Sequence, residues 1–275
     1  MTERLAGLFV RAMAMTVGVV LICLFLKGVT MWGDWRAGGS FWLGWDGSAM
    51  RVIGERIPAS LALYGMALVL SVGLGIPLGC WWGERRWGWL AGLASFFVAV
   101  VVAIPAFWLA AMGVYSLGNV LALPVLADAG GRGWWPGWWQ VMVPAGVVGL
   151  TGAGLVAGRV RRSLLEASEH AAMAVLKARG MGYRQRVAEY ALPASGMTLA
   201  GVAGEMLPVV VGLSVAVEWA WYFPGLGSYA GAAIREGDVS GVLLVALAAG
   251  LATVVLRFLI ELIDLLGSRG RRPSF

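Results

Sequence analysis

Six long apolar runs, each close to the length that a helix needs to cross a bilayer, restrict the fold of this sequence more than any other feature. They cover residues 8–31, 59–82, 90–117, 141–158, 197–222 and 239–266, and a hydrocarbon core takes about 20 helical residues. Charged residues make up only 13% of the chain, whereas they make up about 25% of an average soluble domain. Continuous runs predict helices rather than a barrel. The sequence therefore predicts an all-α integral membrane protein in which residues 1–275 form a single domain of six transmembrane helices.

The basic residues are divided unequally between the two sides of this bundle. An even number of spans places both termini on one side, and that side receives 14 of the 21 lysines and arginines. By the positive-inside rule we expect both termini to be cytoplasmic. The net charge of +6 then reflects orientation and contact with the anionic lipid bilayer, and no nucleic-acid partner is expected.

A polar, basic insert of residues 163–193 separates the fourth and fifth apolar runs on the same side. Ser163 and Glu166 have the spacing of a capping box, which predicts the start of a helix. Gly180 and Gly182 favour a helix end, and Pro193 marks the end of a second short helix. Small apolar side chains recur at helical spacing in the first helix, and they form a narrow stripe of Ala171, Ala174, Val175 and Ala178.

Two environments are compatible with this stripe. A helix that lies on the membrane surface carries bulky apolar side chains, whereas a thin stripe of small side chains fits a groove in another protein. We therefore favour docking to a soluble protein over a membrane-surface helix.

The chain lacks the residue sets of an enzyme or a metal site. Neither Lys27 nor Lys177 is followed by serine or threonine, so no phosphate-binding loop of the Walker type is present. His170 is the single histidine, and the two cysteines fall within apolar runs, which leaves no ligand set for zinc. We expect no catalytic, cofactor-binding or metal-binding residue in this chain.

Glycine pairs one helical turn apart occur in two of the apolar runs. Gly75 and Gly79 form one pair, and Gly154 and Gly158 form the other. Small residues at this spacing let membrane helices approach closely, so both pairs predict helix packing.

Two ionisable residues share a depth inside the fifth and sixth predicted spans. Glu205 in the fifth span and Arg257 in the sixth are both roughly 12–14 Å from the cytoplasmic ends of their helices. Such residues usually face the protein interior or a water-filled cavity. One possibility is an ion pair between the two helices. The alternative is that Arg257 pairs with Glu261 on the same helix while Glu205 lines an aqueous vestibule.

The insert resembles the EAA loop of ABC importer permeases, in which small residues precede a glycine and then a Leu-Pro pair. The matching residues are Ala171-Ala172, Gly180 and Leu192-Pro193. Other segments are similar to the first permease of dipeptide, oligopeptide and nickel importers. They are residues 55–61, 75–79, 105–109 and 218–227.

The resemblance implies a heteromeric importer in a bacterial or archaeal cytoplasmic (inner) membrane. Its other subunits would be a second homologous permease, two ATPase subunits that bind ATP and Mg, and an extracytoplasmic solute-binding protein. The insert would be the coupling helix that docks on an ATPase, with the contact made by Glu166, Ala171, Ala172, Ala174, Val175, Ala178, Gly180, Leu192 and Pro193. The external gate would comprise Glu218, Pro224, Gly225, Leu226 and Gly227.

Peptides or a related small solute are the expected cargo of such an importer. Nickel or a metal chelate is an alternative on the same scaffold. A self-sufficient channel or secondary transporter is less favoured, because the sequence shows no clear inverted repeat and few intramembrane charges.

Overall fold

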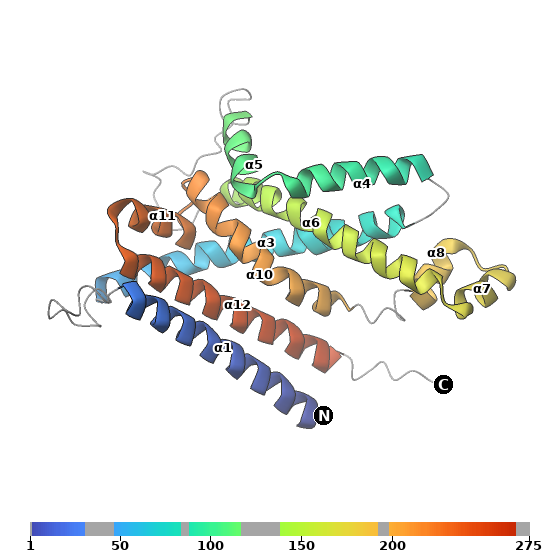
Figure 1. Cartoon of the computed structure of the whole chain (residues 1–275), viewed down its shortest axis with the longest axis horizontal. Coiled ribbons are helices and arrows are strands. Elements are labelled where there is room, and N and C mark those ends of the chain that lie inside the picture. Colours follow the sequence, from blue (N-terminus) through green and yellow to red (C-terminus); the bar gives the residue numbers. More distant parts are fainter. Residues whose placement is uncertain (1, 31–46, 84–87, 117–137, 192–197, 268–275) are drawn as a thin grey trace.

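The computed structural model describes residues 2–30, 47–83, 88–116, 138–191 and 198–267. Five long helices lie side by side (Figure 1): α1 (Thr2–Thr30), α3 (Gly47–Trp82), α6 (Trp138–Ser168), α10 (Leu199–Ala220) and α12 (Val239–Gly267). The shorter elements are α4 (Gly88–Ala103), α5 (Ala106–Gly113), α7 (Ala171–Ala178), α8 (Tyr183–Arg186), the π-helix η3 (Val187–Ala191) and α11 (Leu226–Glu236). The described residues form no strand, and the predicted all-α fold is confirmed.

Five described helices are long and apolar enough to cross a membrane, one fewer than the sequence predicts. The difference lies in the run 90–117, which forms two helices, α4 of 16 residues and α5 of 8 residues. Between them stand Ile104 and Pro105. Proline has no amide hydrogen and disfavours a helical conformation in the residue before it, so the helix breaks and turns here (Figure 1). The prediction of six uninterrupted spans is therefore wrong.

The helix α6 is longer than the predicted fourth span, because it continues to Ser168 rather than ending near residue 158. Ser163 and Glu166 consequently lie inside α6, and the predicted helix start at Ser163 is wrong. Leu164 and Ala167 of this stretch are buried. The burial of these two side chains keeps the backbone helical at Ser163, although serine locally favours a helix end.

The helices α3 and α6 pack closely along their length. A Cβ atom added to Gly75 would lie 2.5 Å from Cβ of Val156, and one added to Gly79 would lie 2.6 Å from Cβ of Val160. No side chain larger than hydrogen fits at either position, so the close packing predicted for this pair is confirmed. Nothing lies within 4 Å of a Cβ added to Gly158, and the packing role predicted for that residue is wrong. Instead, α6 meets Leu70 and Ser71 of α3 at Gly149 and Gly152.

Helix α1 begins, and helix α12 ends, on the side of the bundle where α7 and α8 project. Helix α11 lies at the opposite end (Figure 1). Bulky apolar side chains are exposed along α1 and α12, which marks these faces as suited to lipid; examples are Phe9, Leu21, Phe25, Leu259 and Ile263.

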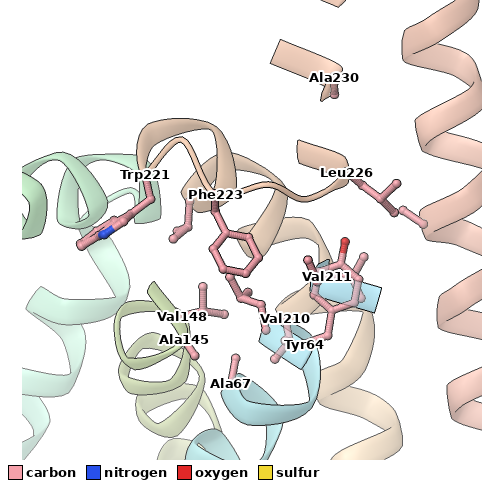
Figure 2. Close-up of a cluster of buried hydrophobic side chains, with 14 of the residues drawn as sticks. Tyr64, Ala67, Ala145, Val148, Val210, Val211, Trp221, Phe223, Leu226 and Ala230 are labelled. Atoms are coloured by element: carbon pink, nitrogen blue, oxygen red, sulfur yellow. The ribbon is translucent and has the colours of Figure 1, made fainter. Parts of the chain in front are cut away.

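A main hydrophobic core lies between α3, α6, α10 and the turn that leads to α11. Tyr64 of α3, Val148 of α6 and Val210 of α10 are each fully buried in it. Phe223, from the α10–α11 turn, points toward Val210 (Figure 2), and Leu226, the first residue of α11, belongs to the same buried cluster. The turn is therefore part of the core rather than a surface loop.

Candidate functional site

The insert presents the predicted stripe on its outer face. Ala171, Ala174, Val175 and Ala178 of α7 are all exposed, and Val175 is 52% accessible. Met173, on the opposite face of the same helix, is only 4% exposed. The side chains that the sequence groups as a stripe thus form a continuous open surface, which we call the α7 stripe.

The stripe is bordered by positive charge. Lys177 and Arg179 at the end of α7 and Arg184 of α8 are exposed. Exposed Glu169 stands just before the stripe, so a partner that covers the α7 stripe would meet charges of both signs along the insert.

The helix α7 ends as the sequence predicts. Gly180 has φ +80°, a left-handed conformation that glycine adopts without steric cost. Its amide donates to the carbonyl of Lys177 at 3.0 Å, and the amide of Met181 donates to the carbonyl of Leu176 at 3.2 Å. This pair of hydrogen bonds is a Schellman motif, and it turns the chain back toward the bundle.

A second hydrophobic cluster attaches the insert to the long helices. Met173 of α7 and Val187 of η3 share this cluster with Leu164 of α6 and with Val202 and Met206 of α10. The insert therefore rests on α6 and α10.

The end of α3 also meets the insert. A Cβ atom added to Gly83 would lie 3.3 Å from the Tyr183 hydroxyl oxygen. Next to it, the guanidinium of Arg161 lies 4.9 Å from the ring centre of Trp82, a cation–π contact between α6 and α3. Met173 and Tyr183 were given no role by the sequence, although the helical period places Met173 opposite the stripe.

Other residues of the predicted coupling set either lie apart from the α7 stripe or are not described by the structure. Glu166 is exposed but belongs to α6. Leu192 and Pro193 lie outside the described residues. Ala172 is partly buried beside the stripe.

The predicted external gate is a tight turn between α10 and α11. Glu218, in the last turn of α10, is fully buried, and its Oε2 accepts a hydrogen bond of 2.6 Å from the amide of Gly227. Leu226 is 1% exposed. Tyr222 has φ 50°, a conformation that costs a residue with a side chain roughly 1–2 kcal/mol. The surroundings of the turn must therefore hold it in place.

The glycines of this turn are required by close contacts. A Cβ atom on Gly225 would lie 2.6 Å from Oγ of Ser60 in α3, and a Cβ atom on Gly227 would lie 2.8 Å from Cα of Val215 in α10. The sequence Pro224-Gly225-Leu226-Gly227 thus allows the start of α11 to lie directly against two long helices.

The intramembrane charges are arranged differently from the predicted interhelical pair. Arg257 donates from Nε to Oε1 of Glu261 on the same helix at 2.9 Å. Glu205 pairs with Arg159 of α6. Arg159 was counted outside the spans, and the extension of α6 explains its position.

A polar cleft of about 720 Å³ lies between α1, α10 and α12. Glu205, Arg257 and Glu261 all line it, together with Arg11 and Asp264. Helices α10 and α12 therefore share an open, charged cleft, and Glu205 does not pair with Arg257 across it. This agrees with the alternative in which Arg257 pairs with Glu261 and Glu205 lines an aqueous vestibule.

Comparison with known proteins gives a family for this chain and several named relatives. Residues 75–272 match the family described as "Binding-protein-dependent transport system inner membrane component". A putative peptide transport system permease protein of Brucella abortus (strain 2308) is 24% identical over 226 residues, which cover 78% of this chain and 68% of the relative. The probable D,D-dipeptide transport system permease protein DdpB of Escherichia coli (strain K12) is 26% identical over 232 residues, which cover 76% of this chain and 68% of the relative.

A solved structure shares the fold. It is an inward-facing conformation of the MetNI methionine ABC transporter, whose matched chain is covered completely, with 82% of this chain aligned, 19% identity and a TM-score of 0.60. At this identity the match supports the overall arrangement of the helices alone.

Proposed function

The chain belongs to the family of binding-protein-dependent transport system inner membrane components, and we propose that it forms half of the path by which peptides enter the cell. It is the permease component of an ABC importer. The relatives described above are named as peptide and dipeptide permeases, which favours peptides over nickel or a metal chelate as the cargo. The second half of the path would come from a homologous permease.

The energy for transport would come from partner subunits. In this proposal two ATPases bind ATP and Mg on the cytoplasmic side, and a solute-binding protein delivers the peptide outside. The chain itself contributes no catalytic, cofactor or metal residue. Both termini and the insert are placed in the cytoplasm, because the positive-inside rule assigns the insert's cations to that side.

The observation that carries the coupling proposal is the division of α7 into two faces. Its small, exposed stripe is free to enter a groove, while Met173 on the other face is fixed to α6 and α10. Force applied to the stripe would therefore reach the long helices without passing through a flexible loop. Gly180 and Ala172 would shape the ends and flank of this contact.

The turn with Glu218 and Pro224-Gly225-Leu226-Gly227 is proposed as part of the external gate. It lies at the end of the bundle opposite the insert (Figure 1). Its buried carboxylate and its strained Tyr222 make it a defined structure rather than a loose loop.

The coupling proposal is tested by placing a charge on the stripe. Ala174→Arg would bury an unpaired cation in the ATPase contact, which costs several kcal/mol, so substrate-stimulated ATP hydrolysis of the purified complex should be lost. Ala188→Arg is the matched control, because Ala188 is exposed on η3 outside the stripe. Equal stimulation of both variants and of the unaltered complex would reject the stripe as the docking surface.

A further inference from the structure

The segment 55–61, which lies in the first half of α3, has no role in the proposal above. We propose that Arg56 and Ser60 of this segment, acting with Glu218, anchor the first turn of α11 to α3. The external gate then moves as one body with α3. The inference rests on the proposed gate, and it assigns positioning roles to two residues outside it.

The anchor begins with the unpaired amides of α11. The first amides of a helix have no acceptor within the helix, and the N-cap residue here is Gly225, which has no side chain to accept them. Ser60 Oγ accepts from the Leu226 amide at 2.8 Å, and Glu218 Oε2 accepts from the Gly227 amide at 2.6 Å. Ser60 and Glu218 are both 0% exposed. Two other helices thus cap α11.

Arg56 holds the same turn from its outer side. Its Nη1 donates to Oγ of Ser228 at 2.8 Å and approaches the Gly225 carbonyl oxygen at 3.4 Å. The Ser228 hydroxyl in turn donates to that carbonyl at 2.9 Å. The guanidinium also lies 5.8 Å from the ring centre of Tyr229. Because Arg56 and Ser60 are four residues apart, they lie on one face of α3.

The two glycines and Leu226 complete the fit. A Cβ atom on Gly225 would collide with Ser60 Oγ, so α3 and the turn are in direct contact. Leu226 is itself buried as a member of the main core. Further along α11, Ile234, Arg235 and Glu236 are exposed. Ala230 and Ala233 on the other face remain buried, so the helix is capped at its first turn and packed along one face.

The consequence is mechanical. Breaking the contact to α3 would leave the amide of Leu226 without its Ser60 acceptor, and an unsatisfied group at a buried position is costly. The start of α11 therefore stays attached to α3 during transport, and movement of α3 carries the gate with it.

The first test measures the anchor without using transport. Ser60→Ala removes the acceptor for Leu226, and hydrogen exchange of the amides of Leu226 and Gly227 should rise about 3- to 10-fold in the purified complex in lipid nanodiscs. Ser71→Ala is the matched control, because Ser71 is also fully buried in α3 but bonds to Ala67 and Gly149. Unchanged exchange in Ser60→Ala, or an equal rise in both variants, would overturn the anchor.

The second test addresses the role in transport and uses a partly exposed residue that folding tolerates better. Arg56→Gln should reduce solute import at least about threefold while the complex still assembles and hydrolyses ATP, and Arg56→Lys should restore part of the loss because it keeps a cationic donor. Arg51→Gln is the control, since Arg51 is exposed on the same helix. Import by Arg56→Gln equal to that of Arg51→Gln would overturn the positioning role. If the unaltered complex did not hydrolyse ATP, the proposed function would be refuted. The hydrogen-exchange test of the anchor does not depend on that outcome.

Discussion

Replacing Met173 with alanine should release the insert from the bundle. Met173 is 4% exposed and fills the contact between α7 and the buried side chains of α6 and α10. Truncating a buried methionine to alanine costs about 2–5 kcal/mol. A helix of eight residues is not stable by itself, so α7 depends on this contact. Since about 1.4 kcal/mol is a factor of ten, opening of the insert should increase at least about tenfold.

Trypsin provides a direct assay of that opening. The insert carries cleavage sites after Lys177, Arg179 and Arg184, which are exposed but held in ordered backbone. The cleavage rate of the purified complex should rise at least about tenfold in Met173→Ala, in proportion to the open population. Met142→Ala is the control, because Met142 is 38% exposed on α6. A cleavage rate in Met173→Ala equal to that in Met142→Ala would refute the argument that this side chain holds the insert.

Two further outcomes follow from the packing and charges. Gly79→Leu should lower the free energy of unfolding of the purified chain by about 1–3 kcal/mol, because the new side chain collides with α6. Gly158→Leu should leave the free energy of unfolding nearly unchanged, and equal losses in the two variants would contradict the packing. In a double-mutant cycle on stability, Glu205→Gln and Arg159→Gln should be coupled by under about 1 kcal/mol, since both side chains are about half exposed. Glu205 should show no coupling to Arg257, and a measurable coupling there would contradict the observed pairing.

Local patterns predicted the parts of the site that depend on one helix. The α7 stripe follows from the helical period, and the end of α7 follows from Gly180, because these features need no knowledge of neighbouring helices. The break of the third run at Pro105 was available from the same kind of argument, but the length of the apolar run concealed it. Ser163 and Glu166 misled for the opposite reason: their spacing matches a cap, yet buried neighbours keep the helix continuous.

Contacts between helices were beyond local patterns. The sequence offered Arg257 as the interhelical partner of Glu205, and only the rotation and register of α6 select Arg159 instead. Ser60 appears in the sequence as a small residue in an apolar helix. Its role depends on the turn before Leu226, which lies 166 positions away along the chain.

The helix α3 connects the two ends of the proposed machinery. Near its start Ser60 accepts from the first turn of α11, and just past its end Gly83 meets Tyr183 of the insert. Between these points, Gly75 and Gly79 hold it against α6. Its internal prolines, Pro58 and Pro77, fall within the two contact segments, where each removes a helical hydrogen bond and permits bending. The stretch between them keeps its hydrogen bonds and carries Ser60, so it would move as a unit with the gate, whereas Pro77 allows the end of α3 at the insert to bend relative to it.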